Sequence, residues 1–207
     1  MPVSKFFKLL FALATLLCGC SRGYETAGGY AQGGVWSVTY NAEGISVSRG
    51  EVQSAIDAIL EDIDTTLSGY NRNSLLSRLN AGESVGLNPL FEEIYSLSYD
   101  IFLESGGAVD VAAGPIFDLW GFGFSGGSMP DAAAVDSVRA RCGMRLLKAP
   151  DQIDWSAPLS AASFLAEGVE APSPRLNFNA IAQGYSCDLV ADYLHFISRN
   201  SDNKLDP

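Results

Sequence analysis

The sequence predicts an α/β or α+β fold, because stretches with strand periodicity alternate with stretches with helical periodicity. Between Val35 and Tyr40, apolar and aromatic side chains recur at every second position, as in a half-buried strand. Two long amphipathic stretches follow, the first after Ser48 and the second after Asn88. The order of the strands in the sheet stays open at this point.

The first helix is predicted to begin at Ser48, because Glu51 three residues later completes a capping-box pattern. We expect one face of this helix to pack on the sheet and Ser68-Gly69 to end it. Its apolar residues recur at helical spacing: Val52, Ala55, Ile56, Ile59, Leu60, Ile63 and Leu67.

A second helix is predicted from Asn88-Pro89, a cap residue followed by proline at the first helical position. Gly106-Gly107 should end it, and a third helix is expected between Asp131 and Gly143. The apolar stripe of the second helix comprises Leu90, Ile94, Leu97 and Ile101.

The remaining stretches carry weaker patterns. Residues 106–127 alternate glycine with aromatics, which predicts a close-packed loop. Short strand-like pieces are expected at 145–148 and 152–155. A strand from Leu176 should lead into a turn marked by Gly184 and then into a last helix.

The amino terminus has the pattern of a lipoprotein signal. Two lysines precede an apolar stretch that is too short for a comfortable bilayer span, and a small residue then precedes Cys20. We expect residues 1–19 to be the signal peptide, Cys20 to be lipidated, and residues 20–33 to form a lipidated tether. An ordinary cleaved signal or an anchor helix is the alternative. Lipidation would leave the protein exported, anchored to a bacterial membrane and facing the periplasm.

Charge and cysteine content limit the classes of function. The chain has a formal net charge of −11, and removal of residues 1–19, with two lysines and no acid, makes the mature chain more acidic still. This balance argues against nucleic acid as a partner. Cys142 and Cys187 are expected to be buried free thiols, a disulfide being the alternative in an oxidising compartment. The single histidine, His195, is expected to be a solvated helix residue.

The chemistry-bearing motifs of common enzymes are missing. There is no nucleophile elbow, no phosphate-binding Walker loop and no glycine-rich dinucleotide fingerprint between a strand and a helix. Three other segments stand out by composition. They are Leu67–Tyr70 continuing into Ser74–Asn80, Gly107–Asp110 continuing through Gly114-Pro115 to Leu119–Gly123, and Leu176–Tyr185 followed by Asp188.

In this order, the three segments resemble motifs of the FAD:protein FMN transferase family, the ApbE-type flavin transferases. The resemblance implies an ApbE-like sheet flanked by helices. It also implies Mg²⁺-dependent transfer of FMN from FAD to a threonine or serine hydroxyl of an exported acceptor protein, with release of AMP. FAD as substrate, Mg²⁺ and a flavin-accepting protein are therefore the expected partners.

The resemblance also implies roles for single residues. Ala180 matches the residue whose backbone carbonyl binds Mg²⁺, and no catalytic side chain is assigned. Tyr70 could instead simply cover the core, and Asp110 could be a turn cap. The positions that match flavin-contacting residues are Gln32, Tyr70, Ala108, Val109, Asp110, Asn177 and Gln183.

The family pattern continues beyond the point that this sequence reaches. Its second half carries a histidine-isoleucine-aspartate-proline segment and an aspartate-alanine…threonine stretch that completes the metal site. After Leu194 this sequence has a polar segment without strand periodicity up to Pro207. We therefore expect residues 34–207 to be the N-terminal part of the transferase domain, lacking the C-terminal half. The alternative function is a non-catalytic truncated lipoprotein with at most residual flavin binding.

Overall fold

The sheet consists of one antiparallel hairpin in the computed structural model, which describes residues 23–122 and 129–202. Strand β1 (Tyr24–Ala31) pairs with β2 (Gly34–Asn41) over their full lengths. Gln32 and Gly33 connect them with φ values of 51° and 77°, the left-handed pair of a type I′ turn. The strand predicted from Val35 to Tyr40 is thus confirmed.

The predicted tether is wrong over residues 24–31, because these residues form β1. Its glycine- and tyrosine-rich composition indicated a linker, but pairing with β2 and burial of Ala27 beneath α2 order it. The predicted signal segment 1–19 and Cys20 lie outside the described residues. No helix within the described ranges is long and apolar enough to cross a membrane.

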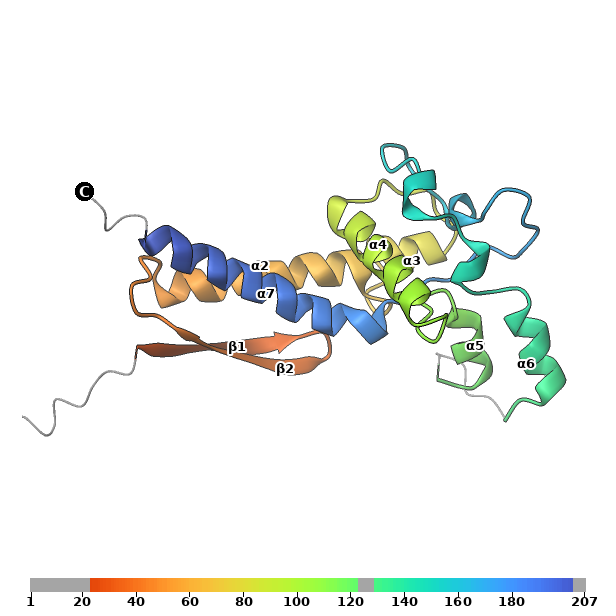
Figure 1. The fold of residues 1–207 in the computed structure, drawn as a ribbon. Coiled ribbons are helices and arrows are strands. Elements are labelled where there is room, and N and C mark those ends of the chain that lie inside the picture. Colours follow the sequence, from red (N-terminus) through yellow and green to blue (C-terminus); the bar gives the residue numbers. More distant parts are fainter. Residues whose placement is uncertain (1–22, 123–128, 203–207) are drawn as a thin grey trace, which may run out of the picture.

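Two long helices cover the hairpin (Figure 1). Helix α2 (Arg49–Leu67) and helix α7 (Asn179–Asp202) run antiparallel beside each other, and α2 contacts β1. The capping box at the start of α2 is formed as predicted: Ser48 N–H donates to Glu51 Oε2 at 2.9 Å, and Ser48 Oγ accepts from Glu51 N–H. The core of this part comprises Ala27, Tyr40, Val52, Ile56, Leu60, Val190 and Ile197.

A second core lies around α3 (Leu75–Asn80) and α4 (Pro89–Glu104). The start of α4 at Asn88-Pro89 is confirmed, but its predicted apolar stripe is displaced by about one position. Of that stripe only Ile94 is fully buried, and the largest buried side chains on the helix are Phe91 and Tyr95. They face inward because Phe178 and Phe164, far along the chain, pack on them with ring centroids 5.5 and 5.1 Å apart.

The glycine-rich stretch after α4 was predicted to be loop, but part of it is helical. Helix α5 (Gly114–Leu119) forms within it, with Pro115 in its first turn. Helix α6 (Ala132–Arg139) follows with Asp131 as its N-cap, which confirms the predicted third helix start.

The strand-like pieces predicted at 145–148 and 152–155 are wrong. Single 3₁₀ turns overlap these positions: η1 (Met144–Leu146) and η2 (Pro150–Gln152). A third such turn, η3 (Ala161–Phe164), follows in the segment after them. Two isolated bridges, Val85 with Leu159 and Leu147 with Leu165, are the only sheet-like pairing in this part of the described chain.

The segment from Leu176 also differs from its prediction. Residues 176–178 are extended but belong to no strand, and α7 begins at Asn179, so Gly184 lies inside a helix instead of marking a turn. His195 is exposed on α7 as expected. Both described cysteines are free thiols, but only Cys142 is buried; the predicted burial of Cys187 is wrong, because it lies on an exposed position of α7.

We predict that Ser48→Ala lowers the free energy of unfolding by about 1 kcal/mol, because it removes the N-cap of α2. The hydrogen bonds from Ser48 lower the pKa of Glu51. A carboxyl group with a lowered folded-state pKa adds stability above its unfolded pKa and loses it as pH falls. The difference between wild type and variant, measured by urea denaturation, should therefore shrink in acid. Ser84→Ala, at an exposed loop serine, is the matched control and should change little.

Candidate functional site

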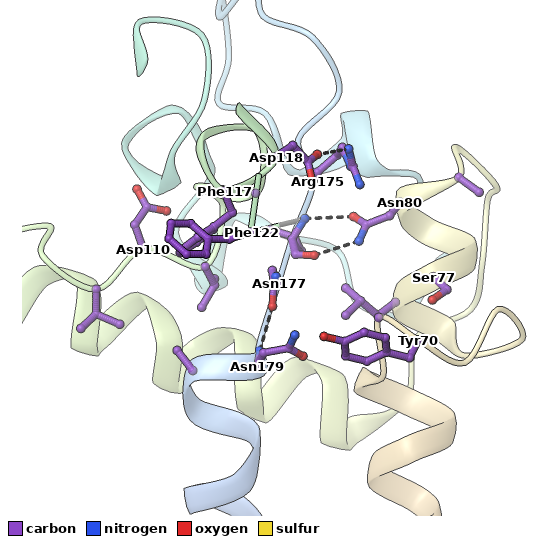
Figure 2. A pocket seen from close by; sticks show the side chains of 18 of the residues that line it. Tyr70, Ser77, Asn80, Asp110, Phe117, Asp118, Phe122, Arg175, Asn177 and Asn179 are labelled. Atoms are coloured by element: carbon purple, nitrogen blue, oxygen red, sulfur yellow. Dashed lines mark hydrogen bonds and ion pairs between the residues drawn. The ribbon is translucent and has the colours of Figure 1, made fainter. Parts of the chain in front are cut away.

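A cavity of about 860 Å³ opens between the end of α2, α3, α5 and the start of α7 (Figure 2). All three motif segments of the sequence contribute to its wall. Six of the predicted site residues line it: Tyr70, Ala108, Val109, Asp110, Asn177 and Ala180. Further lining residues with polar or aromatic side chains are Ser77, Asn80, Phe117, Asp118, Phe122, Arg175 and Asn179.

A second cavity of about 500 Å³ adjoins the first and contains the other two predicted residues, Gln32 and Gln183. Tyr70 and Asn179 line both cavities, so the two form neighbouring compartments. Gln32 at the hairpin turn donates through Nε2 to Ser186 Oγ at 2.5 Å, which joins the turn to α7. The hairpin therefore supplies one wall of the smaller compartment.

Tyr70 is held by the turn that ends α2. Its backbone N–H and that of Asn71 donate to Ser68 Oγ at 3.3 and 3.1 Å. The carbonyl of Ser68 accepts from the hydroxyls of Ser74 and Ser77, at 2.6 and 3.0 Å. This turn presents the Tyr70 side chain with 73% of its surface exposed, which is inconsistent with the alternative that the ring simply covers the core.

Asn80 joins the first motif to the third. Its side-chain oxygen accepts from Leu176 N–H at 2.9 Å, and its Nδ2 donates to the Leu176 carbonyl at 2.8 Å. The next residue, Asn177, donates its N–H to the Val111 carbonyl at 2.7 Å, and its side-chain oxygen accepts from Asn179 N–H. These bonds fix the extended backbone of residues 176–178 along the cavity wall, as Figure 2 shows.

The Asp110 side chain forms hydrogen bonds with backbone N–H groups. Its carboxylate accepts from Ala112 N–H at 2.8 Å and from Met144 N–H at 3.0 Å. A Cβ at Gly143 would stand 2.8 Å from Asp110 Oδ2, so glycine permits this close approach. Asp110 thus acts as the turn cap that the sequence left as an alternative, and its contact with flavin stays a prediction.

Cys142 lies beside this turn. Burial raises the pKa of its thiol, and the nearby Asp110 carboxylate raises it further. The thiol is therefore protonated at neutral pH and is a poor nucleophile. A covalent role for Cys142 in the chemistry of the cavity is not supported.

The metal expectation rests on Ala180 alone. Ala180 lies in the first turn of α7 and lines the larger cavity, and the role of its carbonyl as a metal ligand stays a prediction. Within residues 23–122 and 129–202, no group of three His, Cys, Asp or Glu side chains could hold a metal ion. Mg²⁺ prefers about six oxygen ligands, usually with carboxylates among them. The described residues do not fit a complete Mg²⁺ site.

Sequence reasoning missed several lining residues. Asn80 closes the serine- and leucine-rich segment after Tyr70, and its position in that motif was the only signal of its importance. Asp118 and Arg175 form an ion pair across the cavity wall, and no local pattern connects two residues so far apart in sequence. Asn179 carried no signal beyond its place in the third motif.

Comparison with known proteins agrees with this arrangement. Residues 33–198 match the ApbE family. The chain belongs to this family. It is 29% identical over 195 residues to an FAD:protein FMN transferase of Salmonella typhimurium, with 87% of this chain and 53% of the relative covered. It is 30% identical over 196 residues to the Vibrio cholerae protein of the same name, with 89% and 54% covered.

Solved structures of the ApbE family share the fold. The apo form of the Pseudomonas stutzeri flavinyl transferase ApbE matches with a TM-score of 0.69 and 28% identity, over 84% of this chain and 53% of that one. The Vibrio cholerae flavin transferase ApbE matches with a TM-score of 0.66 and 25% identity, over 83% and 53%. The chain spans about half the length of the curated relatives that it matches.

We predict that Asn80→Ala lowers the free energy of unfolding by about 1–3 kcal/mol, because both backbone groups of Leu176 lose their partner. Hydrogen exchange at the Leu176 amide should accelerate more than exchange within α4. Asn80→Asp, which keeps the acceptor and loses the donor, is the isosteric comparison. If the Leu176 amide in Asn80→Ala stays as well protected from hydrogen exchange as in wild type, the Asn80 side chain does not hold this backbone in place.

Proposed function

We propose that the protein acts as an FAD:protein FMN transferase, in which FMN passes from FAD to a threonine or serine hydroxyl of an exported acceptor protein. The observation that carries the proposal is the convergence of three separate ApbE motifs on one cavity. Its volume lies in the range of 300–1,000 Å³ typical of small-molecule sites. A second compartment beside it provides room for an extended ligand such as FAD.

The lining suits a flavin nucleotide. The residues Tyr70, Phe117 and Phe122 are 73%, 45% and 82% exposed, so they present aromatic surface to which isoalloxazine or adenine can bind. Side-chain amides of Asn177 and Gln183 supply donors and acceptors for the polar edges of such rings. In this proposal, the backbone of Ala108 and Val109 forms the floor against which the ring system lies.

The proposed transfer exchanges one phosphorus–oxygen bond for another. The acceptor hydroxyl oxygen attacks the phosphorus of the FMN part, the bond from that phosphorus to the bridging oxygen breaks, and AMP leaves. The hydroxyl proton passes to solvent. Mg²⁺, when bound, supplies neutralisation of phosphate charge. Since the described residues do not fit a complete Mg²⁺ site, the proposal requires metal ligands beyond those described.

A second candidate is a non-catalytic lipoprotein that retains flavin without transferring FMN. The observation in its favour is the same deficit of metal-binding side chains in the described ranges. The two candidates share a flavin-binding cavity and differ only in chemistry. Covalent labelling therefore separates them, whereas flavin affinity does not.

The transferase would be supported if the purified chain, given FAD and Mg²⁺, labels a threonine-bearing acceptor covalently with flavin and releases AMP in equal amount. In-gel flavin fluorescence and chromatography of the nucleotide would measure both. An acceptor with valine in place of the threonine should stay unlabelled. Flavin retention without label or AMP would favour the non-catalytic candidate, and no affinity for FAD would contradict both.

We also propose that the protein is exported and anchored through lipid on Cys20, facing the periplasm. The lysines, the apolar stretch and the small residue before Cys20 support this location. The anchor would hold the cavity where exported acceptors occur.

Cys20→Ser should abolish lipid attachment, so that the protein either leaves the membrane fraction or keeps its signal segment. Fractionation and metabolic labelling with a fatty acid would measure this change. Cys187→Ser, at an exposed cysteine of α7, is the matched control and should leave both unchanged. Equal incorporation of the labelled fatty acid into Cys20→Ser and wild type would contradict the lipid anchor.

A further inference from the structure

The charges that line the two cavities are unequal. Three carboxylates line them, those of Asp64, Asp110 and Asp118, whereas Arg175 is the one cationic side chain among the described lining residues. Asp110 accepts from backbone amides, and Asp64 accepts from the Asn71 side chain. Among these lining residues, Arg175 is therefore the side chain whose positive charge can attract an anionic ligand.

Arg175 is held at the cavity by α5. A Cβ at Gly114 would stand 2.8 Å from the Arg175 carbonyl oxygen, so the backbone of Arg175 packs directly on the first turn of that helix. One turn later on the same helix, the Asp118 carboxylate pairs with Arg175 Nη1. Figure 2 shows this pair near Asn80, toward the end of the pocket away from Tyr70 and Asn179.

The ion pair is accessible to a ligand. The side chains of Arg175 and Asp118 are 50% and 26% exposed. Ion pairs with this much exposure contribute little to stability, so exchange of one carboxylate for another anion has a low cost. The guanidinium group has five N–H donors in a planar fork, which suits two oxygens of a phosphate group.

We infer that Arg175 binds the pyrophosphate of FAD and that Asp118 holds the guanidinium group in place until the nucleotide enters. This inference rests on the proposed function, since it says which residue binds the charged part of FAD, the ligand of that function. The two ring systems of FAD are uncharged at neutral pH, and its negative charge lies on the two phosphate groups. The pyrophosphate is therefore the part of FAD that Arg175 recognises.

Two substitutions separate charge recognition from a structural role. Arg175→Gln and Asp118→Asn both break the ion pair, but only Arg175→Gln removes the cation. We expect Arg175→Gln to weaken binding of FAD and of ADP by about tenfold or more, the effect of losing a charge-assisted hydrogen bond. Its affinity for riboflavin, which has no phosphate, should stay unchanged. Asp118→Asn should bind FAD at least as tightly as wild type.

Calorimetry with FAD, ADP and riboflavin on the purified chain, at low and high salt, would measure these effects. Arg175→Lys, which keeps the charge and loses the fork, should fall between wild type and Arg175→Gln. Thermal melts check that the variants fold. Equal weakening by Arg175→Gln and Asp118→Asn, or a parallel loss of riboflavin affinity, would overturn the inference.

Failure of the inference and failure of the proposed function give different results. Wild-type affinity for FAD in Arg175→Gln would overturn the role of Arg175 and leave flavin transfer standing. A selective loss of FAD and ADP affinity in that variant, without any FMN transfer by the wild type, would support Arg175 and contradict the transferase. A wild-type chain that binds neither FAD nor ADP would contradict both.

Discussion

The paired hydrogen bonds between Asn80 and Leu176 are the constraint on which the site depends. They join two segments that are 96 residues apart, and they satisfy both backbone groups of a residue that belongs to no strand. Because Leu176 is fixed, Asn177 reaches the cavity and α7 begins at Asn179. Helix α7 then returns to the hairpin, where Ser186 meets Gln32. The two cavities thus share a wall that this one contact orients.

Features set by neighbouring residues could be predicted from the sequence. The capping box at Ser48, the caps at Asn88 and Asp131, and the alternation in β2 each depend on side chains within a few positions. Features set by residues far apart in the sequence could not be predicted in this way. Which face of α4 turns inward depends on Phe164 and Phe178. Strand β1 forms because it pairs with β2, and the composition of β1 gives no sign of this pairing.

The same division applies to the site. The motif resemblance predicted eight site positions, and all of them line the two adjoining cavities. It did not give their partners: Asp110 is bound by the Met144 amide and Arg175 by Asp118, contacts across 34 and 57 residues. Hydrogen bonds and ion pairs between distant segments depend on the completed fold, so a single sequence does not contain a local pattern for them.

The polar groups of the site divide into two sets with different tasks. Ser68, Asn80 and Asp110 direct their side chains at the backbone and are partly buried, so they form a scaffold that is satisfied without a ligand. Tyr70, which follows Ser68, and Phe122, which lines the same cavity, have most of their surface exposed. Exposed aromatic surface costs solvation free energy in the empty protein, and a planar ligand recovers it on binding. If the proposed function holds, a flavin that covers these aromatic faces would therefore raise the stability of the folded protein.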